Sequence, residues 1–179
     1  MASVFTHAFV AAAMGKVYTP EPLPARFWLL AMTCAVLPDA DVAAFSFGVP
    51  YGHTFGHRGF THSLAFALLV GAGVVALFFR GEGRRASRVA FFSLVTASHA
   101  ALDALTNGGL GVAFFSPFSN RRYFFPFRPV EVSPIGVESF FSEWGLAVIR
   151  SELLWVWLPC TLLAAAVLIW RRKAAGSSQ

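Results

Sequence analysis

The chain has 179 residues, of which 56% are hydrophobic and only 13% are charged, and its mean hydropathy is +0.62. A soluble domain of this size usually carries about 25% charged residues, so the composition excludes an ordinary soluble protein and indicates a membrane protein. The net charge of +5 does not indicate nucleic-acid binding, because the basic residues flank apolar stretches. The length fits one helical domain over residues 1–179.

Five apolar stretches follow one another along the chain, and we expect each to be helical. They are residues 4–14, 27–47, 64–79, 89–105 and 153–170. A membrane span needs about 20 apolar residues, with a lower limit near 17. The second, fourth and fifth stretches are therefore long enough to cross, the third is marginal and the first is short. The expected fold is all-α, a polytopic bundle of four to five transmembrane helices.

Basic residues predict which helix ends face the cytoplasm. Four arginines lie in the loop 80–88, and three basic residues, 171–173, follow the last stretch. If both segments are cytoplasmic, as the positive-inside rule favours, the turn 16–26 is also inside. Residues 48–63 and 106–151 then lie on the outer side. Nine basic residues fall inside and five outside, so the opposite orientation stays open.

This topology gathers imidazoles and carboxylates at the outer ends of the helices. The set contains every aspartate and four of the five histidines: His7, Asp39, Asp41, His57, His62, His99 and Asp103. Such ligands without thiolates suit zinc, with manganese or iron as alternatives. Seven candidate ligands exceed the needs of one tetrahedral ion, so we expect two or more divalent ions. The fifth histidine, His53, is peripheral, and Cys34 and Cys160 lie singly, as packing residues do.

Two pairs in this set also have a structural interpretation. His99 and Asp103 are four residues apart, which places them on one helix face as joint ligands or as a hydrogen-bonded pair. Asp39 and Asp41 follow Pro38, which disfavours helical geometry at the residue before it. They are ligands of one site or helix-capping carboxylates. His7, taken alone, is more typical of a packing residue, and its place opposite the other clusters favours a ligand.

The most specific motif is Gly-His-Arg-Gly-Phe-Thr-His-Ser, residues 56–63, which interrupts apolar sequence. Polar groups there lose hydration and must recover it from protein partners, a metal or a water-filled cavity. We expect its two histidines to converge on a metal and its two glycines to allow close backbone approach. Thr61 or Ser63 is expected to cap the helix that begins at Leu64.

Three arginines are candidate substrate-binding residues. The Arg58 guanidinium matches phosphate oxygens with two parallel hydrogen bonds, although an interfacial arginine also meets lipid headgroups. Arg121 and Arg122 belong to a loop, residues 116–129, in which aromatic residues, arginines and prolines alternate. This loop is expected either to anchor at the headgroup level or to fold over the metal site and hold a phosphate.

Taken together, these motifs and their order, from His7 to the arginine and aromatic loop, resemble the YdjM family of inner-membrane metal-dependent hydrolases. They are similar, more distantly, to zinc-dependent phospholipase C and related single-strand nucleases. The resemblance covers residues 7 to about 128 and implies phosphoester hydrolysis at the seven ligand residues. One departure is Val42, which stands where the family pattern has a histidine after the second aspartate.

The expected function is a multi-pass inner-membrane phosphoesterase acting on a phospholipid or lipid-linked substrate. A metal-bound hydroxide is the expected nucleophile, Asp41 or Asp39 orients or deprotonates it, and Arg58 holds the phosphate. Intramembrane His and Asp residues also build proton relays and cation sites, so a metal or proton transporter is the alternative. A third candidate is a structural protein whose metal holds helices together. Membrane lipids are the expected partners, and oligomeric state stays open.

Overall fold

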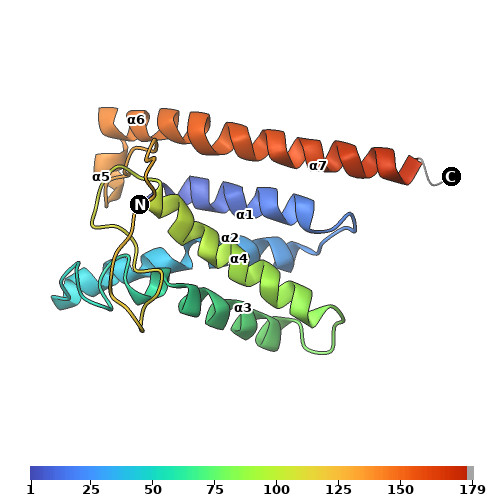
Figure 1. Cartoon of the computed structure of the whole chain (residues 1–179), viewed down its shortest axis with the longest axis horizontal. Coiled ribbons are helices and arrows are strands. Elements are labelled where there is room, and N and C mark those ends of the chain that lie inside the picture. Colours follow the sequence, from blue (N-terminus) through green and yellow to red (C-terminus); the bar gives the residue numbers. More distant parts are fainter. Residues whose placement is uncertain (177–179) are drawn as a thin grey trace.

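The computed structural model describes residues 1–176, and its regular structure is helical (Figure 1). Within these residues there is no β-strand, only two isolated bridges. The all-α prediction is therefore confirmed. The elements in chain order are α1 (Val4–Tyr18), α2 (Ala25–Val36), η1 (Leu37–Phe47), η2 (Phe60–His62), α3 (Leu64–Phe78), α4 (Arg85–Ala104), α5 (Val137–Phe140), α6 (Glu143–Glu152), η3 (Leu153–Trp157) and α7 (Leu158–Gly176).

Side-chain caps determine where α1 and α3 begin. The Ser63 hydroxyl accepts a hydrogen bond from the Phe66 backbone N–H at 3.1 Å, which confirms one of the two predicted caps of α3. The Ser3 hydroxyl accepts from the Thr6 N–H at 3.4 Å at the start of α1. Each cap satisfies one of the N–H groups that a helix N-terminus leaves without a partner.

Pro38 changes the type of helix at the point where the sequence predicts a break. α2 ends at Val36 and passes into the 3-10 helix η1, which Gly48 terminates with a φ of +74°. Proline has no N–H to donate, so the α-helical hydrogen-bond ladder cannot continue unchanged through it. The α-helix therefore ends as expected, but the chain continues in the same direction and carries the two aspartates of η1.

An aromatic cluster fixes α2, α3 and α4 against one another. The Phe27 ring lies 4.8 Å from Phe91, 5.2 Å from Phe92 and 6.3 Å from Phe79, measured between ring centroids. All four side chains are buried. Cys34 packs in the same core and, like Cys160, is a free thiol, as expected.

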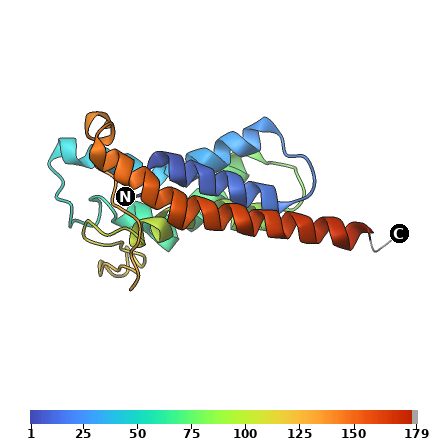
Figure 2. The same ribbon diagram turned by 90° about the horizontal axis from the view of Figure 1, so that it is seen from above.

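A third layer is formed by α6, η3 and α7, which run as one long rod beside α1 (Figure 2). Phe9 and Trp157 stack at 4.2 Å with an angle of 2° between their rings. The buried Glu152 carboxylate accepts hydrogen bonds from Ser3 Oγ at 2.6 Å and Thr6 Oγ1 at 2.8 Å. Only 6% of the most apolar part of the rod is buried, so most of its surface is free to meet lipid.

Two segments of the described chain are long and apolar enough to cross a membrane, Ala25–Phe47 and Glu143–Gly176. They contain the second and fifth predicted stretches. The fourth predicted stretch, residues 89–105, was also expected to cross, and it lies in α4. α4 is not apolar enough to count as a span, because it carries arginine, serine, threonine, histidine and aspartate. Nine α4 residues are buried, and these include the polar residues Thr96, His99 and Asp103. These polar side chains therefore face protein rather than lipid. α3 is apolar but shorter.

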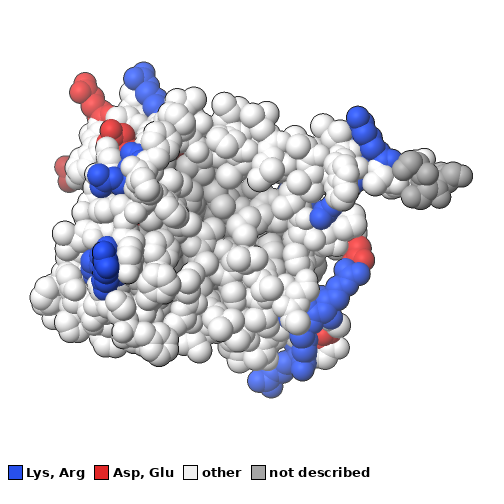
Figure 3. Space-filling view, in the orientation of Figure 1, with Lys and Arg blue, Asp and Glu red and all other residues white. Residues whose placement is uncertain are grey.

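Charged side chains gather toward the two ends of the helices, and the surface between them carries few charges on the face in Figure 3. Arg84 contacts Glu21 at 3.2 Å and Arg26 pairs with Glu82, which joins the α1–α2 and α3–α4 loops. Arg171 donates to the Val17 carbonyl at 2.6 Å. The three basic segments that the sequence groups together therefore lie at one end, called here the basic end.

Candidate metal centre

All seven predicted ligands belong to one cluster at the opposite end of the helices. α1 contributes His7, η1 contributes Asp39 and Asp41, the loop before α3 contributes His57 and His62, and α4 contributes His99 and Asp103. All are buried except Asp39, which is partly buried. His99 and Asp103 lie one turn apart on the inner face of α4, as their spacing predicts.

Four of these residues present atoms with the spacing of a tetrahedral metal site. His62 Nε2 lies 3.0 Å from His99 Nε2, 3.5 Å from Asp103 Oδ2 and 3.6 Å from Asp39 Oδ1. The distance from His99 Nε2 to Asp39 Oδ1 is 3.2 Å. Ligand atoms that lie 2.0–2.1 Å from a tetrahedral zinc ion are roughly 3.3 Å apart. The group Asp39, His62, His99 and Asp103 therefore fits one such ion.

Hydrogen bonds direct a lone pair from each of two imidazoles into this site. His99 Nδ1 lies 2.7 Å from the Ala35 carbonyl, which only accepts, so Nδ1 carries the proton. His62 Nδ1 lies 3.1 Å from Thr61 Oγ1, which donates its own proton to Asp41 and so accepts one from Nδ1. Two neutral rings would therefore direct lone pairs at each other across 3.0 Å. Such an arrangement needs a cation between them, either a proton or a metal ion.

The carboxylates of the site also favour a bound cation. Neither oxygen of Asp39 accepts a hydrogen bond from any residue in the range 1–176, although both oxygens are buried. A buried carboxylate left in this state is costly, and coordination to a metal removes that cost. Three aspartates face one arginine in the cluster, so the excess negative charge favours a divalent ion.

Asp41 holds the second group of the cluster by hydrogen bonds. Its Oδ1 lies 2.7 Å from His57 Nδ1, and its Oδ2 accepts from Thr61 Oγ1 at 2.6 Å and from the Arg58 backbone N–H at 3.2 Å. Asp41, His57 and His62 also have the composition of a metal site. The 2.7 Å contact between Asp41 and His57 fits a hydrogen bond, and the expected second ion stays a prediction.

His7 lies at the edge of the tetrahedral group. Its ring stacks on His99 with 3.7 Å between centroids, and its Nε2 lies 3.6 Å from Asp103 Oδ1. Neither ring nitrogen has a hydrogen-bond partner among the described residues, and the ring is 1% exposed. His7 is not one of the four residues with metal-site spacing, and its predicted role as a ligand stays a prediction.

Arg58 is placed differently from the sequence prediction of a phosphate-binding side chain. It is fully buried, its Nε lies 2.9 Å from Asp103 Oδ2, and its terminal nitrogens donate to Thr106 Oγ1 at 3.0 Å and to the Gly108 carbonyl at 2.8 Å. The guanidinium is thus engaged by one ion pair and two hydrogen bonds within the protein. Arg58 thus pairs with the Asp103 carboxylate in this structure, and its predicted phosphate-binding role stays a prediction.

Arg122 is likewise occupied by protein contacts. Its guanidinium donates to the backbone carbonyls of Tyr51 at 2.9 Å, His57 at 3.0 Å and Gly111 at 3.3 Å. It therefore joins the loop before η2 to the loop after α4. Arg121 is exposed and its guanidinium lies over the Tyr123 ring at 5.4 Å, so among the three predicted arginines it alone presents its charge at the surface.

The backbone of residues 56–63 is as tight as its glycines predict. A Cβ at Gly56 would lie 2.2 Å from the Pro50 carbonyl oxygen, and one at Gly59 would lie 2.2 Å from the Thr54 oxygen. Arg58, between them, has a φ of +60°. This compact turn positions His57 and His62 on either side of Asp41.

Two supports of the cluster were missed in the sequence. The Ala2 N–H donates to Asp103 Oδ1 at 2.7 Å, and Glu152 holds the start of α1 through Ser3 and Thr6. An acidic residue directly before an 18-residue apolar stretch was the available signal for Glu152. No comparable signal marks the role of the Ala2 backbone.

A cavity of about 380 Å³ borders the cluster beside His57, and we call it the His57 cavity. Its polar side chains include Tyr51, Ser139 and Trp144. The Tyr51 ring meets the His57 ring edge to face at 5.2 Å between centroids. His57 therefore contacts both this cavity and the Asp41 carboxylate, and a molecule in the cavity lies beside the His57 ring.

The fold and this centre define a class of protein: an all-helical membrane protein with a buried His and Asp cluster of metal-binding character at one helix end. Comparison with known proteins identifies the family. The chain belongs to the YdjM inner membrane protein family, whose family model matches residues 1–175. The family resemblance drawn from the sequence motifs is thereby confirmed.

A curated relative supports the same assignment. The inner membrane protein YbcI of Escherichia coli (strain K12) is 41% identical to this chain over 176 residues, which cover 97% of this chain and 100% of that protein. No solved structure matches the chain. The expected likeness to zinc-dependent phospholipase C is carried by neither match and stays a prediction. Family membership and the two apolar segments indicate an inner-membrane location.

Proposed function

We propose that this protein is a multi-pass, metal-dependent phosphoesterase of the inner membrane, acting on a phospholipid or lipid-linked substrate. The observation that carries the proposal is the close approach of Asp39, His62, His99 and Asp103, whose side chains are buried except for the partly buried Asp39. Zinc is the ion that this ligand set suits best, with manganese and iron as alternatives. A bound divalent ion supplies water activation and charge neutralisation at a phosphoryl oxygen.

His57 and Asp41 provide proton transfer in this proposal. Asp41 accepts from His57 Nδ1 at 2.7 Å, which leaves the other ring nitrogen, Nε2, to take or give a proton. His57 also lines the cavity that borders the centre. Asp41 thus acts as a positioning residue for both His57 and His62, and Arg58 keeps the charge of Asp103 compensated.

The multi-pass arrangement with the centre on the outer side is part of the proposal. It is supported by the apolar segments Ala25–Phe47 and Glu143–Gly176 and by the shorter apolar α3. The arginine-rich loops gather at the end away from the centre, as cytoplasmic loops do. In this arrangement α4 crosses inside the bundle, covered by the other helices.

Purified protein loaded with zinc should hydrolyse a phosphodiester such as bis-p-nitrophenyl phosphate or a detergent-dispersed phospholipid. Replacing His57 by Ala should lower kcat by about 10²–10⁴-fold, because general acid–base catalysis is lost, while zinc content stays unchanged. His53→Ala, at an exposed histidine nearby, is the matched control and should retain full turnover.

Two alternative functions, a transporter and a structural metal site, predict different results in the same samples. A metal or proton transporter moves zinc or protons across liposomes without turnover, and a structural metal site leaves any turnover unchanged in His57→Ala. Zinc flux without hydrolysis, or hydrolysis insensitive to both His57→Ala and His99→Ala, would contradict the phosphoesterase proposal.

A further inference from the structure

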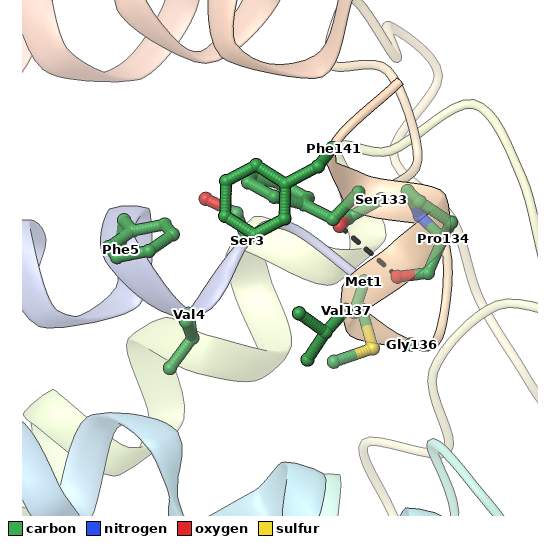
Figure 4. A pocket seen from close by; sticks show the side chains of 10 residues that line it. Met1, Ser3, Val4, Phe5, Ser133, Pro134, Gly136, Val137 and Phe141 are labelled. Atoms are coloured by element: carbon green, nitrogen blue, oxygen red, sulfur yellow. Dashed lines mark hydrogen bonds between the residues drawn. The ribbon is translucent and has the colours of Figure 1, made fainter. Parts of the chain in front are cut away.

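A second cavity of about 260 Å³ lies at the start of α1 and beside α5 (Figure 4). Its lining is apolar and includes Val4, Phe5, Val137, Phe140 and Phe141. The Phe5 and Phe140 rings lie 5.9 Å apart between centroids. We call this space the phenylalanine cavity.

The phenylalanine cavity adjoins the His57 cavity. Met1, Ser133 and Pro134 line both spaces. The shared wall places an apolar compartment on one side and His57, with its Asp41 partner, on the other. A molecule that fills both has to be apolar at one end and polar at the other.

We infer that the two cavities form one binding site for an alkyl-chain amphiphile, with the chain in the phenylalanine cavity and the polar head in the His57 cavity. The identity of the head, a phosphoester, rests on the function proposed above. The chain site itself follows from the lining residues and from the wall that the two cavities share.

Exposed apolar side chains around the phenylalanine cavity favour a lipid chain over a water-soluble ligand. Phe5 is 58% exposed, Val137 75% and Phe141 80%. In a membrane protein such side chains face hydrocarbon or the interface, so an alkyl chain reaches the cavity without crossing water. The only hydroxyls in the lining belong to Ser3 and Ser133, and the Ser3 hydroxyl is bonded to Glu152.

Chain length should therefore control affinity. Burial of a methylene is worth about fourfold in binding, and the gain should stop once the phenylalanine cavity is filled. If only the head group binds, at the metal centre, affinity should not depend on chain length. Butyl phosphate and octyl phosphate are suitable probes, because they share one head and differ only in chain length.

The decisive experiment uses an octyl phosphate that carries a diazirine at the end of its chain. Irradiation of the full-length protein in detergent should label peptides containing residues 1–5 and 133–141, as identified by mass spectrometry. Unlabelled octyl phosphate should compete about 10²-fold better than butyl phosphate, because four more methylenes are buried at about fourfold each. Label spread evenly over α7 and the other exposed helix faces would overturn the inference.

A matched pair of tryptophan substitutions tests the location. Val137→Trp places a large ring in the cavity and should reduce labelling at both peptides about tenfold, whereas Leu146→Trp, at an exposed α6 residue that is not part of the lining, should not. Equal labelling in the two variants would overturn the chain site. If Val137→Trp fails to fold, the competition in the unmodified protein still decides. Saturable labelling without hydrolysis leaves the chain site standing and contradicts the phosphoesterase alone.

Discussion

The two nitrogens of the His62 ring face different partners, and this sets the chemistry of the centre. Nδ1 faces Asp41, while Nε2 faces His99, Asp39 and Asp103. Burial alone would lower the pKa of His62, but the three carboxylates of Asp103, Asp39 and Asp41 close to its ring outweigh burial and raise the pKa to about 10. Without metal the ring therefore carries a proton at neutral pH, which is the cation that the opposed lone pairs require.

Metal affinity should rise with pH as a consequence. The pKa of His62 is raised from 6.5 to about 10 in the folded, metal-free protein, so an incoming ion has to displace that proton at any lower pH. Zinc affinity is therefore expected to increase about tenfold per pH unit between about pH 7 and about pH 9. Competition with a chromogenic chelator measures it, and a pH-independent affinity over this range contradicts the assignment of His62 as a ligand.

Arg58→Gln should destabilise the fold rather than weaken substrate binding. The substitution removes the partner of the fully buried Asp103 carboxylate, and breaking a buried ion pair typically costs about 3–5 kcal/mol. The exposed Arg121→Gln serves as the control and should stay within about 0.5 kcal/mol. Thermal unfolding in detergent measures both. Unchanged stability with a raised KM would return Arg58 to its predicted phosphate-binding role.

Residue types and spacing were sufficient to predict which side chains form the cluster. They were not sufficient to predict which partner each side chain contacts. The His99 and Asp103 spacing fixes a shared helix face, and the glycines of residues 56–63 predict a tight turn. Whether Arg58 faces a substrate or Asp103 depends on its own left-handed backbone conformation, with a φ of +60°, which no periodicity encodes. The sequence therefore predicts the membership of the cluster better than its contacts.

Among the elements, α4 connects the aromatic core to the candidate metal centre. Its first half contributes Phe91 and Phe92 to the aromatic cluster, and its second half contributes His99 and Asp103. The length of the stretch 89–105 suggested a membrane span here, but length does not distinguish a helix that faces lipid from one whose polar residues are buried against protein. The cap of α3 and the apolar length of Ala25–Phe47 were predictable, because they depend on local chemistry.

The close packing of α3 on α4 can be tested by a matched pair of glycine substitutions. A Cβ at Gly71 would lie 2.2 Å from Ser93 Oγ and 2.8 Å from the Val89 carbonyl oxygen, whereas nothing lies within 4 Å at Gly73. Gly71→Ala should cost about 1–3 kcal/mol from overpacking. Gly73→Ala should stabilise the helix by roughly 0.5–1 kcal/mol. Equal melting temperatures for the two variants would contradict this packing.

At the scale of the whole molecule, the positions of the basic end and the metal centre predict opposite sides of the membrane. Gly52 and Gly83 are exposed, and a side chain at either meets nothing within 4 Å. In a chain with Cys34 and Cys160 replaced by Ala, a membrane-impermeant maleimide applied to spheroplasts should label Gly52→Cys directly. It should label Gly83→Cys only after permeabilisation. The reverse pattern contradicts the outer location, and equal labelling contradicts a membrane between the two loops.

The central claim is that Asp39, His62, His99 and Asp103 hold a divalent ion, and the metal content of purified protein tests it most directly. Protein prepared without chelators should contain at least one zinc, manganese or iron ion per chain by mass spectrometry. His99→Ala should lose that ion, since it removes one of four ligands, while His53→Ala should retain it. Unmodified protein without stoichiometric metal, or equal metal in His99→Ala, would contradict the account.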